Sequence, residues 1–582
     1  MKNIIAFFLL VIFVSCETVT DKNTTEFSTP YENSESKETA TYKEVIDFYL
    51  ELAKEFSEIN VQTIGQTDSG YPLHLVTFNP DGEFDFKKLE EEKITLLINN
   101  GIHPGESDGI DATMLLYRDL AEEKISTPKN TVITTIPIYN IGGALNRNSS
   151  TRANQNGPKD YGFRGNALNY DLNRDFIKSD TKNAKTFSQI FHLVQPDIFI
   201  DNHVSNGADY QYALTHLFTQ HNKLGSSLGN YLHNQFMPLL ENKLAKNNWD
   251  ITPYVNVFNT VPEKGFSQFM DHPRYSTGYT TLWNTIGMMV ETHMLKPYKQ
   301  RVEGTYIVLK NAIEIAEKDR KEIKSSRIKT NEYFANLKSY PIHWQVDTLK
   351  TATLNFKGFE ADTIISKVTG FPRLKYNRDK PFTKEIIYQN YFKATDSIPI
   401  PKAYIVQKEW TKIINLLELN DINYSTIEKD TTLFLEKYKI DDYSTSKSPY
   451  EGHYLHYNTS VSKTKKEIKI SKGDIFIPTN QKGVRYILET LEPSCVDSFF
   501  NWNYFDTILQ QKEDFSPYVF EDTAALMLEQ DSVLRESFYS KKKIDTSFSK
   551  NWYAQLDWLY KKSKHYENAH LSYPVYRVPK TE

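Results

Sequence analysis

The stretch that decides the fold is "ITLLINNGIHPGESDG", residues 94–109. It begins with an apolar run typical of a buried β-strand and continues into a Pro-Gly turn that carries His103 and Glu106 three positions apart. Because the chain has 14 histidines and glutamate is common, roughly one His-x-x-Glu is expected by chance. The pair therefore needs support from a preceding strand, a third ligand and matching catalytic groups.

Five apolar segments between residues 42 and 325 are typical of β-strands. They are residues 73–78, 93–99, 131–140, 197–203 and 287–293. Amphipathic helical segments alternate with them, including residues 42–56 and residues 107–123, the second with Ser107 and Asp108 as its cap. This alternation predicts an α/β fold with a largely parallel or mixed sheet, in which ligand sites lie beyond the carboxyl ends of the strands.

The composition is that of an ordinary globular protein. A length of 582 residues predicts about two to four domains. Hydrophobic residues make up 39%, charged residues 25%, and the formal net charge is −5. No basic groove is expected, and we predict no nucleic-acid partner.

The N-terminus has the pattern of an export signal. Lys2 precedes an apolar run at residues 4–14, which is too short to cross a bilayer as a helix. Ser15 and Cys16 then resemble a bacterial lipoprotein cleavage site. We predict a signal peptide over residues 1–16 and an exported lipoprotein, anchored to a membrane in the periplasm or at the cell surface by lipid on Cys16. A plain signal peptide is the alternative.

Composition also divides the rest of the chain. Residues 17–41 are polar and rich in Ser, Thr and Glu, which predicts a disordered tether. A charged stretch after residue 325 precedes a C-terminal accessory region over residues 340–582, predicted as mixed α+β with a subdivision near residue 397. In this region, His453 and His456 have no third potential ligand nearby and are interpreted as structural.

A third histidine completes a potential metal site. His203 ends segment 197–203, much as His103 and Glu106 follow segment 93–99. Catalytic zinc sites use three protein ligands with N or O donors and leave a fourth position for water. Adjacent strand ends would bring these three side chains together, so the sequence predicts one Zn²⁺ at this edge of the sheet.

Glu291 is the candidate general base. It follows the apolar run at residues 288–290, where burial would raise its pKa toward the working range of a base. A carboxylate at the end of a buried strand is costly without a purpose. His293, two residues further on, is interpreted as a supporting or structural residue.

Residues 141–176 form a long irregular stretch inside the predicted domain, and such stretches are usually functional or disordered. The stretch contains four arginines, namely Arg147, Arg152, Arg164 and Arg174. Guanidinium groups match carboxylates in two-point geometry, so the loop is a candidate binder of a terminal carboxylate. A solvated loop whose arginines pair with Asp160, Asp171 and Asp175 is an equal alternative from composition alone.

In this order, the residues resemble the motifs of the zinc carboxypeptidase family, which includes carboxypeptidases A and B. The matching positions are His103 and Glu106 in "HPGE", Asn173 and Arg174 in "YDLNRDF", His203 in "DNHVS" and Glu291 in "MMVETH". The resemblance covers residues 42–320. It implies a three-layer α/β/α catalytic domain with a mixed sheet over residues 42–325.

The resemblance also implies a mechanism. Zn²⁺ would be held by His103, Glu106 and His203 and would polarise a water molecule. Glu291 would take the proton of this water and pass it to the leaving amine. The enzyme would carry one zinc ion per catalytic domain.

Substrate contacts follow from the same resemblance. Asn173 and Arg174 would bind the C-terminal carboxylate of the substrate. A family arginine that steadies the oxyanion corresponds to Arg152 as first choice and to Arg147 as second. The family's arginine two residues after the first zinc ligand is replaced by Gly105.

The family's mobile tyrosine corresponds to Tyr279 or Tyr275, and we favour Tyr279.

Taken together, these motifs predict an exported zinc metallocarboxypeptidase, a metalloprotease that acts on peptide or protein C-termini. One alternative is a zinc hydrolase of the same scaffold that acts on cell-wall stem peptides or N-acyl amino acids. A further alternative is an inactive surface binding protein, although an intact set of ligands and base argues against it.

Overall fold

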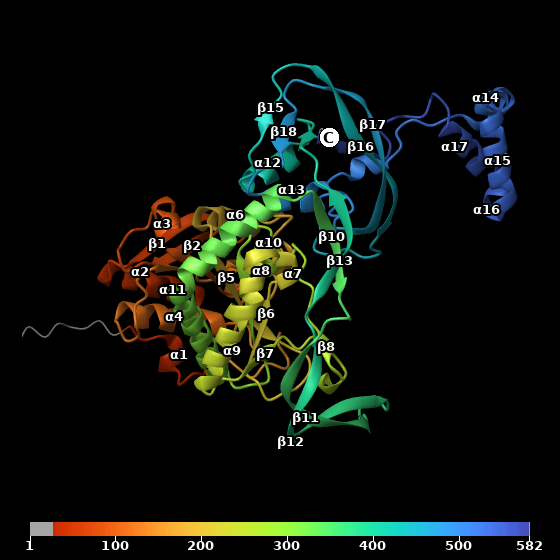
Figure 1. Ribbon diagram of the computed structural model, residues 1–582. Coiled ribbons are helices and arrows are strands. Elements are labelled where there is room, and N and C mark those ends of the chain that lie inside the picture. The colour runs from red at the N-terminus through yellow and green to blue at the C-terminus, as the bar shows by residue number, and fades with distance from the viewer. Residues whose placement is uncertain (1–26, 581–582) are drawn as a thin grey trace, which may run out of the picture.

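The computed structural model describes residues 27–580 and is built around an eight-stranded mixed sheet (Figure 1). In order across the sheet, the strands are β1 (Ile59–Gln66), β2 (Pro72–Phe78), β4 (Thr131–Ile136), β3 (Ile94–Asn99), β5 (Ile198–Ser205), β9 (Ile286–His293), β6 (Leu214–Phe218) and β7 (Ile251–Pro253). The central strands β4, β3, β5 and β9 are parallel. Their carboxyl ends therefore meet at one edge of the sheet.

The centre of the sheet agrees with the sequence. Every residue of β3, β4 and β5 is buried, as expected for parallel strands with both faces covered. The five predicted strands are all present. β4 ends at Ile136 rather than at residue 140, because Pro137 has no N–H to continue the ladder. The predicted α/β class with a mixed sheet is confirmed.

Helices cover both faces of the sheet. Gly109 of α4 packs against Asn202, whereas the Phe187 ring of α6 packs edge-on against the Phe199 ring. Residues 199 and 202 of β5 point to opposite faces because side chains alternate along a strand. The helices that pack together on the α4 side are α2 (Tyr42–Glu55), α4 (Asp108–Ala121), α8 (Ser226–Tyr231), α9 (Met237–Lys246) and α11 (Tyr298–Asn336). The α6 side carries α6 (Lys182–Val194) and α10 (Ser276–Thr281).

Shorter elements join these layers. They are the helices α1 (Pro30–Asn33), α3 (Phe86–Glu92), α5 (Ile141–Leu145) and α7 (His221–Leu224), the single turns η1 (Leu172–Arg174), η2 (Leu232–Phe236) and η3 (Pro262–Lys264), and the short strand β8 (Phe266–Ser267). The last helix of the layers, α11, continues to Asn336 and so passes the predicted domain boundary at residue 325.

The predicted capping role of Ser107 is wrong. Ser107 does occupy the N-cap position of α4, but its side chain makes no capping hydrogen bond. Its hydroxyl instead lies 3.0 Å from the Tyr298 hydroxyl. Asp108 pairs with the buried Arg301 guanidinium. The N-terminus of α4 is therefore held by side-chain contacts with α11 rather than by a capping hydrogen bond within its own first turn.

Residues 27–41, predicted as part of a disordered tether over residues 17–41, are folded in the structure. Residues 27–41 pack on the α4 side of the sheet, where the buried Tyr31 ring lies edge-on to Tyr298 and Glu32 pairs with Arg118. Buried aromatic side chains such as Phe27 and Tyr31 offset the cost of ordering this polar segment. The overall polar composition of this segment predicted disorder because it does not show that these two aromatic side chains are buried.

The predicted signal peptide, the predicted lipidation site Cys16 and residues 17–26 lie outside the described residues. Within residues 27–580, no helix combines the length and the apolar character that a membrane crossing requires.

The C-terminal region, residues 339–580, is built from antiparallel strands and two groups of helices. A long hairpin is formed by β11 (Ala352–Ile365) and β12 (Pro372–Gln389), beside the pair β10 (Ser339–Val346) and β13 (Phe392–Pro399). A six-stranded antiparallel sheet follows in the order β15 (Ser425–Thr426), β18 (Ile475–Pro478), β14 (Ala403–Val406), β19 (Ser572–Val578), β16 (Thr431–Thr445) and β17 (His456–Ile470). The helices are α12 (Thr411–Leu419), α13 (Val484–Leu491), η4 (Asp506–Leu509), α14 (Pro517–Gln530), α15 (Ser532–Ile544), α16 (Thr546–Ser549) and α17 (Trp552–Tyr560).

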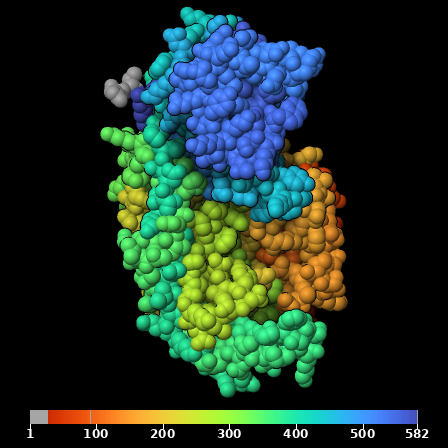
Figure 2. All heavy atoms as spheres, turned by 90° about the vertical axis from the view of Figure 1, so that its right-hand side faces the viewer, coloured from red at the N-terminus to blue at the C-terminus, as the bar shows by residue number. Residues whose placement is uncertain are grey.

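This region packs directly on the α6 side of the first sheet. The Arg274 guanidinium donates to Asp497, with Nε 2.8 Å from Oδ1, and lies 5.0 Å from the Trp502 ring centroid. The buried Arg485 donates to the carbonyl of Thr281 at 2.7 Å. In Figure 2, the cyan and blue atoms of the C-terminal region rest on the orange and yellow-green atoms of the sheet region. The two regions therefore share an interface with buried ion pairs.

The histidine pair of the C-terminal region makes structural contacts. His453 Nε2 lies 2.7 Å from Asp180 Oδ2, and His456 Nε2 lies 3.1 Å from Asp506 Oδ1. His453 thereby joins the C-terminal region to the segment before α6.

The interface predicts a large loss of stability on Asp497→Ala. This change leaves the buried Arg274 without its partner and should lower the free energy of unfolding by about 3–5 kcal/mol. Urea unfolding followed by tryptophan fluorescence measures it. Asp557→Ala, which removes a surface pair with Lys561, is the matched control and should cost at most about 1 kcal/mol. A loss at Asp497 no larger than at Asp557 would contradict the packed interface.

Candidate active site

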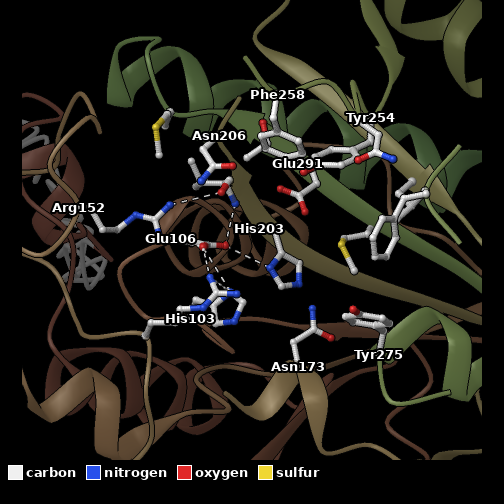
Figure 3. A pocket seen from close by; sticks show the side chains of 18 of the residues that line it. His103, Glu106, Arg152, Asn173, His203, Asn206, Tyr254, Phe258, Tyr275 and Glu291 are labelled. Carbon is white, nitrogen blue, oxygen red and sulfur yellow. Dashed lines mark hydrogen bonds and ion pairs between the residues drawn. The ribbon is translucent and has the colours of Figure 1, made fainter. Parts of the chain in front are cut away.

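A cavity of about 590 Å³ lies at the carboxyl ends of β3, β5 and β9 (Figure 3). This is the edge of the sheet at which α/β proteins place their ligands. The walls come from these strand ends, from residues 151–174, from residues 254–258 and from residues 269–275. Segments that are far apart in the sequence therefore line the same cavity.

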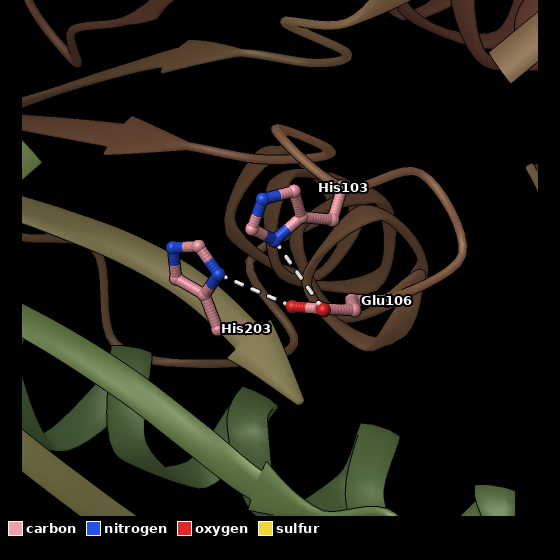
Figure 4. A group of neighbouring side chains, drawn as sticks. All are labelled: His103, Glu106 and His203. Carbon is pink, nitrogen blue, oxygen red and sulfur yellow. Dashed lines mark hydrogen bonds and ion pairs between the residues drawn. The ribbon is translucent and has the colours of Figure 1, made fainter. Parts of the chain in front are cut away.

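Three predicted metal ligands lie together in the wall of this cavity (Figure 4). His103 and Glu106 come from the turn after β3, and His203 comes from the end of β5. His103 Nδ1 lies 3.3 Å from Glu106 Oε1, and His203 Nδ1 lies 3.1 Å from Glu106 Oε2. All three side chains are buried. Among residues 27–580, they form the one group of metal-ligating side chains within mutual reach.

The second nitrogen of each imidazole contacts another carboxylate. His103 Nε2 lies 2.8 Å from Asp171 Oδ1, and His203 Nε2 lies 3.0 Å from Asp201 Oδ2. Burial alone would raise the pKa of Asp171, but the His103 imidazole and the Arg164 guanidinium hold it well below its usual value. Metal-ligating histidines typically donate their other N–H to such a carboxylate, which orients the ring. Both Nδ1 atoms are therefore directed toward the shared centre.

The donor set fits a zinc ion. Two imidazole nitrogens and one carboxylate converge without a thiolate, as in catalytic zinc sites. Burial would raise the pKa of Glu106, but His103 and Arg152 hold it well below its usual value, so this side chain is an ionised donor. Arg152 Nη1 is 2.8 Å from Glu106 Oε1, and the Val204 N–H donates to Oε2 at 2.9 Å. Gly105 makes room for Arg152, because a Cβ there would lie 2.7 Å from the Arg152 Cδ.

Glu291 faces the same cavity from the neighbouring strand. β5 and β9 are paired so that His203 and Glu291 are partners in the parallel register. The Glu291 carboxylate is partly exposed to the cavity and forms no hydrogen bond with other described residues. Burial raises its pKa to about 7, against the lowering effect of His203. A carboxylate with this pKa is suited to general-base catalysis near neutral pH.

Asn173 and Arg174 line the cavity opposite the strand ends. The Asn173 Oδ1 accepts the Ser276 N–H at 3.1 Å, which leaves the amide nitrogen directed into the cavity (Figure 3). Arg174 lies over the Tyr275 ring, 4.6 Å from its centroid, and its Nη1 donates to the Asn173 carbonyl. The remaining guanidinium nitrogens make no hydrogen bond within the described residues. They are free to meet an anionic group.

Two predicted residues do not reach the cavity. The Arg147 guanidinium donates to the carbonyls of Thr39, Ala40 and Asp160, so it fastens the N-terminal segment instead. Tyr279, favoured from the sequence, is fully buried on the inner side of α10 and donates its hydroxyl to Asn420 at 2.6 Å. Of each pair of alternatives, Arg152 and Tyr275 line the cavity.

Several cavity residues were not assigned from the sequence. The most prominent are Arg164, Tyr254, Phe258 and Asp271. Asp171, which contacts His103, was not assigned a role at the site either. Arg164 Nη1 lies 3.5 Å from Glu106 Oε1 and its Nε donates to Asp171. Asp171 stands two residues before Asn173 in "YDLNRDF", so its position in this motif could have identified it as a residue of the site. Tyr254, Phe258 and Asp271 lie in a stretch without motif or periodicity, and only the fold brings them to the cavity. His293, predicted as supporting or structural, is buried and packs on the Tyr210 ring.

Comparisons with curated proteins found similarity to carboxypeptidases. No protein-family model matches the chain. Carboxypeptidase 2 of Trichophyton rubrum is 20% identical over 437 residues, which cover 70% of this chain and 73% of that protein. Carboxypeptidase 2 of Trichophyton equinum is 19% identical over 438 residues, covering 71% and 74%. The chain is thus carboxypeptidase-like in sequence and carries a His-Glu-His cluster of the kind that binds zinc.

Solved structures give weaker similarity. A metallo-carboxypeptidase from Burkholderia cenocepacia is 15% identical with a TM-score of 0.36, covering 47% of this chain and 68% of that one. Carboxypeptidase A from Helicoverpa armigera is 15% identical with a TM-score of 0.36, covering 48% and 74%.

The arrangement of the three candidate ligands predicts that substitution of a ligand reduces zinc binding more than substitution of the carboxylate that orients it. His203→Ala removes a ligand and should abolish stoichiometric zinc binding. Asp201→Asn keeps the ligand but weakens its orientation, and should lower zinc affinity by roughly 10- to 100-fold. Equilibrium dialysis with zinc analysis measures both. His343→Ala, a surface histidine of the C-terminal region, is the control. Unchanged zinc binding by His203→Ala would rule out this centre.

Proposed function

We propose that this chain is a zinc-dependent metallocarboxypeptidase of the carboxypeptidase A and B family, which hydrolyses the last peptide bond of peptides or proteins. One observation carries the proposal. A three-donor metal cluster, the partly exposed Glu291 and the Asn173–Arg174 pair line the same cavity. The similarity to carboxypeptidase 2 of Trichophyton rubrum supports the same conclusion.

His103, Glu106 and His203 would hold the metal. Their nitrogen and carboxylate donors suit Zn²⁺, and the carboxylates of Asp171 and Asp201 keep both imidazoles oriented toward it. When bound, a zinc ion at such a site supplies Lewis-acid chemistry for water and for a carbonyl.

Glu291 would act as the general base. Its carboxylate is open to the cavity, and burial raises its pKa to about 7. It would accept a proton from the attacking water and deliver it to the amine that leaves, so one group serves both transfers. Proton transfer of this kind typically contributes about 10²- to 10⁴-fold to the rate.

The remaining residues would position the substrate. The free guanidinium nitrogens of Arg174 match a carboxylate in two-point geometry, and the Asn173 amide lies beside them. Arg152 would place positive charge near the carbonyl oxygen as negative charge develops on it. A substrate that must present a terminal carboxylate to Arg174 is cut at its end, which defines an exopeptidase. Tyr275, stacked under Arg174, would close this end of the site.

The location of the protein is a separate proposal. The apolar run before Ser15 and Cys16 supports export and a lipid anchor on Cys16. Such a protein would meet peptides outside the cytoplasm.

Glu291→Gln tests the proposed function. This change keeps the shape of the side chain but removes the base, so hydrolysis of a mixed library of peptides should fall by at least about 10²-fold. Zinc content should stay at one ion per chain in both the wild type and Glu291→Gln. Mass spectrometry of the products measures the release of C-terminal residues.

Other outcomes separate the alternatives. A zinc-loaded protein that trims no peptide would direct attention to cell-wall stem peptides or N-acyl amino acids. A protein that binds no metal would contradict the proposal and favour a surface binding protein. Equal activity of the wild type and Glu291→Gln would remove Glu291 from the mechanism.

A further inference from the structure

A smaller cavity, of about 190 Å³, lies where α6 and α11 meet the C-terminal region. One side is lined by residues of α6, by Trp283, which follows α10, and by Arg327 of α11. The other side is lined by residues 421–423 and 481–483 of the C-terminal region. None of its lining residues belongs to the cavity that holds the metal cluster. Its volume equals that of about six water molecules, which suits a molecule no larger than a single amino acid.

Two hydrogen-bond donors in the wall of this interface cavity have no acceptor. Trp283 is 7% exposed and Arg327 is 9% exposed. Within residues 27–580, neither the Trp283 indole N–H nor the Arg327 Nε–H donates a hydrogen bond. All four N–H groups on the two terminal nitrogens of Arg327, in contrast, have acceptors. A buried donor without an acceptor costs about 1–3 kcal/mol, so the two unpartnered donors favour a ligand with acceptor oxygens.

Aromatic rings form the rest of the inner wall. The His192 ring lies edge-on to Trp283, with 4.5 Å between the ring centroids. Burial lowers the pKa of His192 to about 4, so its imidazole is uncharged near neutral pH. Phe191 adds an apolar side chain to the same wall. This part of the interface cavity therefore suits an apolar group next to the acceptor oxygens.

The outer side of the interface cavity carries charged residues. Asp421 and Lys482 line it and are exposed, whereas Trp283 and Arg327 are buried. Lys482 Nζ already donates to Gln195 Oε1 at 2.6 Å. The Asp421 carboxylate forms no ion pair or hydrogen bond with the rest of the described chain. A carboxylate on the outer side and unpartnered N–H donors on the inner side match the two charged groups of a zwitterion.

We propose that this interface cavity is a binding site for a free α-amino acid. The carboxylate of the amino acid would accept from Trp283 and Arg327, its ammonium group would face Asp421, and an apolar side chain would pack on Phe191. The site is separate from the metal cluster, and its existence does not depend on the proposed hydrolysis. A free amino acid is, however, also what such a hydrolysis would release. Since the walls come from both regions, the bound amino acid would contact the sheet region and the C-terminal region together.

Calorimetric titration of the full chain with L-leucine tests this site. Arg174→Ala is used as the starting protein, so that leucine cannot bind through Arg174 in the cavity of the metal cluster. Leucine should bind with a stoichiometry of one. Two analogues each lack one charged group. Replacing leucine with 3-methylbutylamine, which lacks the carboxylate, should weaken binding by at least about 10-fold. Replacing it with 4-methylpentanoate, which lacks the ammonium group, should weaken binding by about 2- to 5-fold, because Asp421 is exposed.

Substitutions in the cavity wall then locate the bound leucine. Trp283→Phe keeps an aromatic ring but removes the indole N–H, and should lower leucine affinity by about 10-fold or more. Asp421→Asn removes a charge from an exposed position and should lower it by about 2- to 5-fold. Asp557→Asn, in α17, is the matched control and should leave the affinity unchanged.

Three results would overturn the proposal. They are no leucine binding to Arg174→Ala, equal affinity for leucine and 3-methylbutylamine, and an unchanged leucine affinity in Trp283→Phe. Urea unfolding shows whether Trp283→Phe is folded. The analogue series requires no change in the cavity wall, so it decides the proposal even where that variant does not fold.

Discussion

The buried carboxylate of Glu106 is the interaction on which the rest of the site depends. Two imidazoles, the Arg152 guanidinium and the Val204 N–H converge on its two oxygens. A buried charge requires such partners, and here they come from the turn after β3, from the end of β5 and from the irregular segment after β4. The parallel arrangement of β3, β5 and β9 brings these segments to one edge. The topology of the sheet therefore creates the centre, and each local sequence supplies one part of it.

The C-terminal region supports this centre from outside. The backbone N–H of Asp171 donates to Glu451 at 2.8 Å, while its side chain contacts His103. The C-terminal region is thus two hydrogen bonds from His103, a candidate metal ligand. The buried pair of Arg274 and Asp497 fastens the segment that carries Asp271 in the same way. A region predicted as accessory from the sequence therefore packs against the segments that carry Asp171 and Asp271.

How far the sequence predicts this structure depends on the range of the contacts involved. The strands β3 and β5 are continuous apolar runs, so they and the candidate metal ligands at their ends could be predicted directly. Arg152 and Arg174 were singled out by the resemblance to the carboxypeptidase motifs, because composition alone left a solvated loop as an equal alternative. Tyr279, which the sequence favoured, does not reach the cavity, because the direction of a side chain in the short helix α10 depends on the core that packs against it. Asp271 could not be found, since an unpartnered carboxylate is defined only by what surrounds it in space.

A paired-peptide digest tests the central claim most directly. One peptide is prepared with a free C-terminus and with a C-terminal amide, and both are incubated with the purified protein before chelation, after chelation and after zinc is restored. A carboxypeptidase built around the Glu106 centre should shorten only the free peptide, one residue at a time, and only when zinc is present. Cleavage of the amidated peptide at the same rate, or activity that survives complete removal of the metal, would contradict the account.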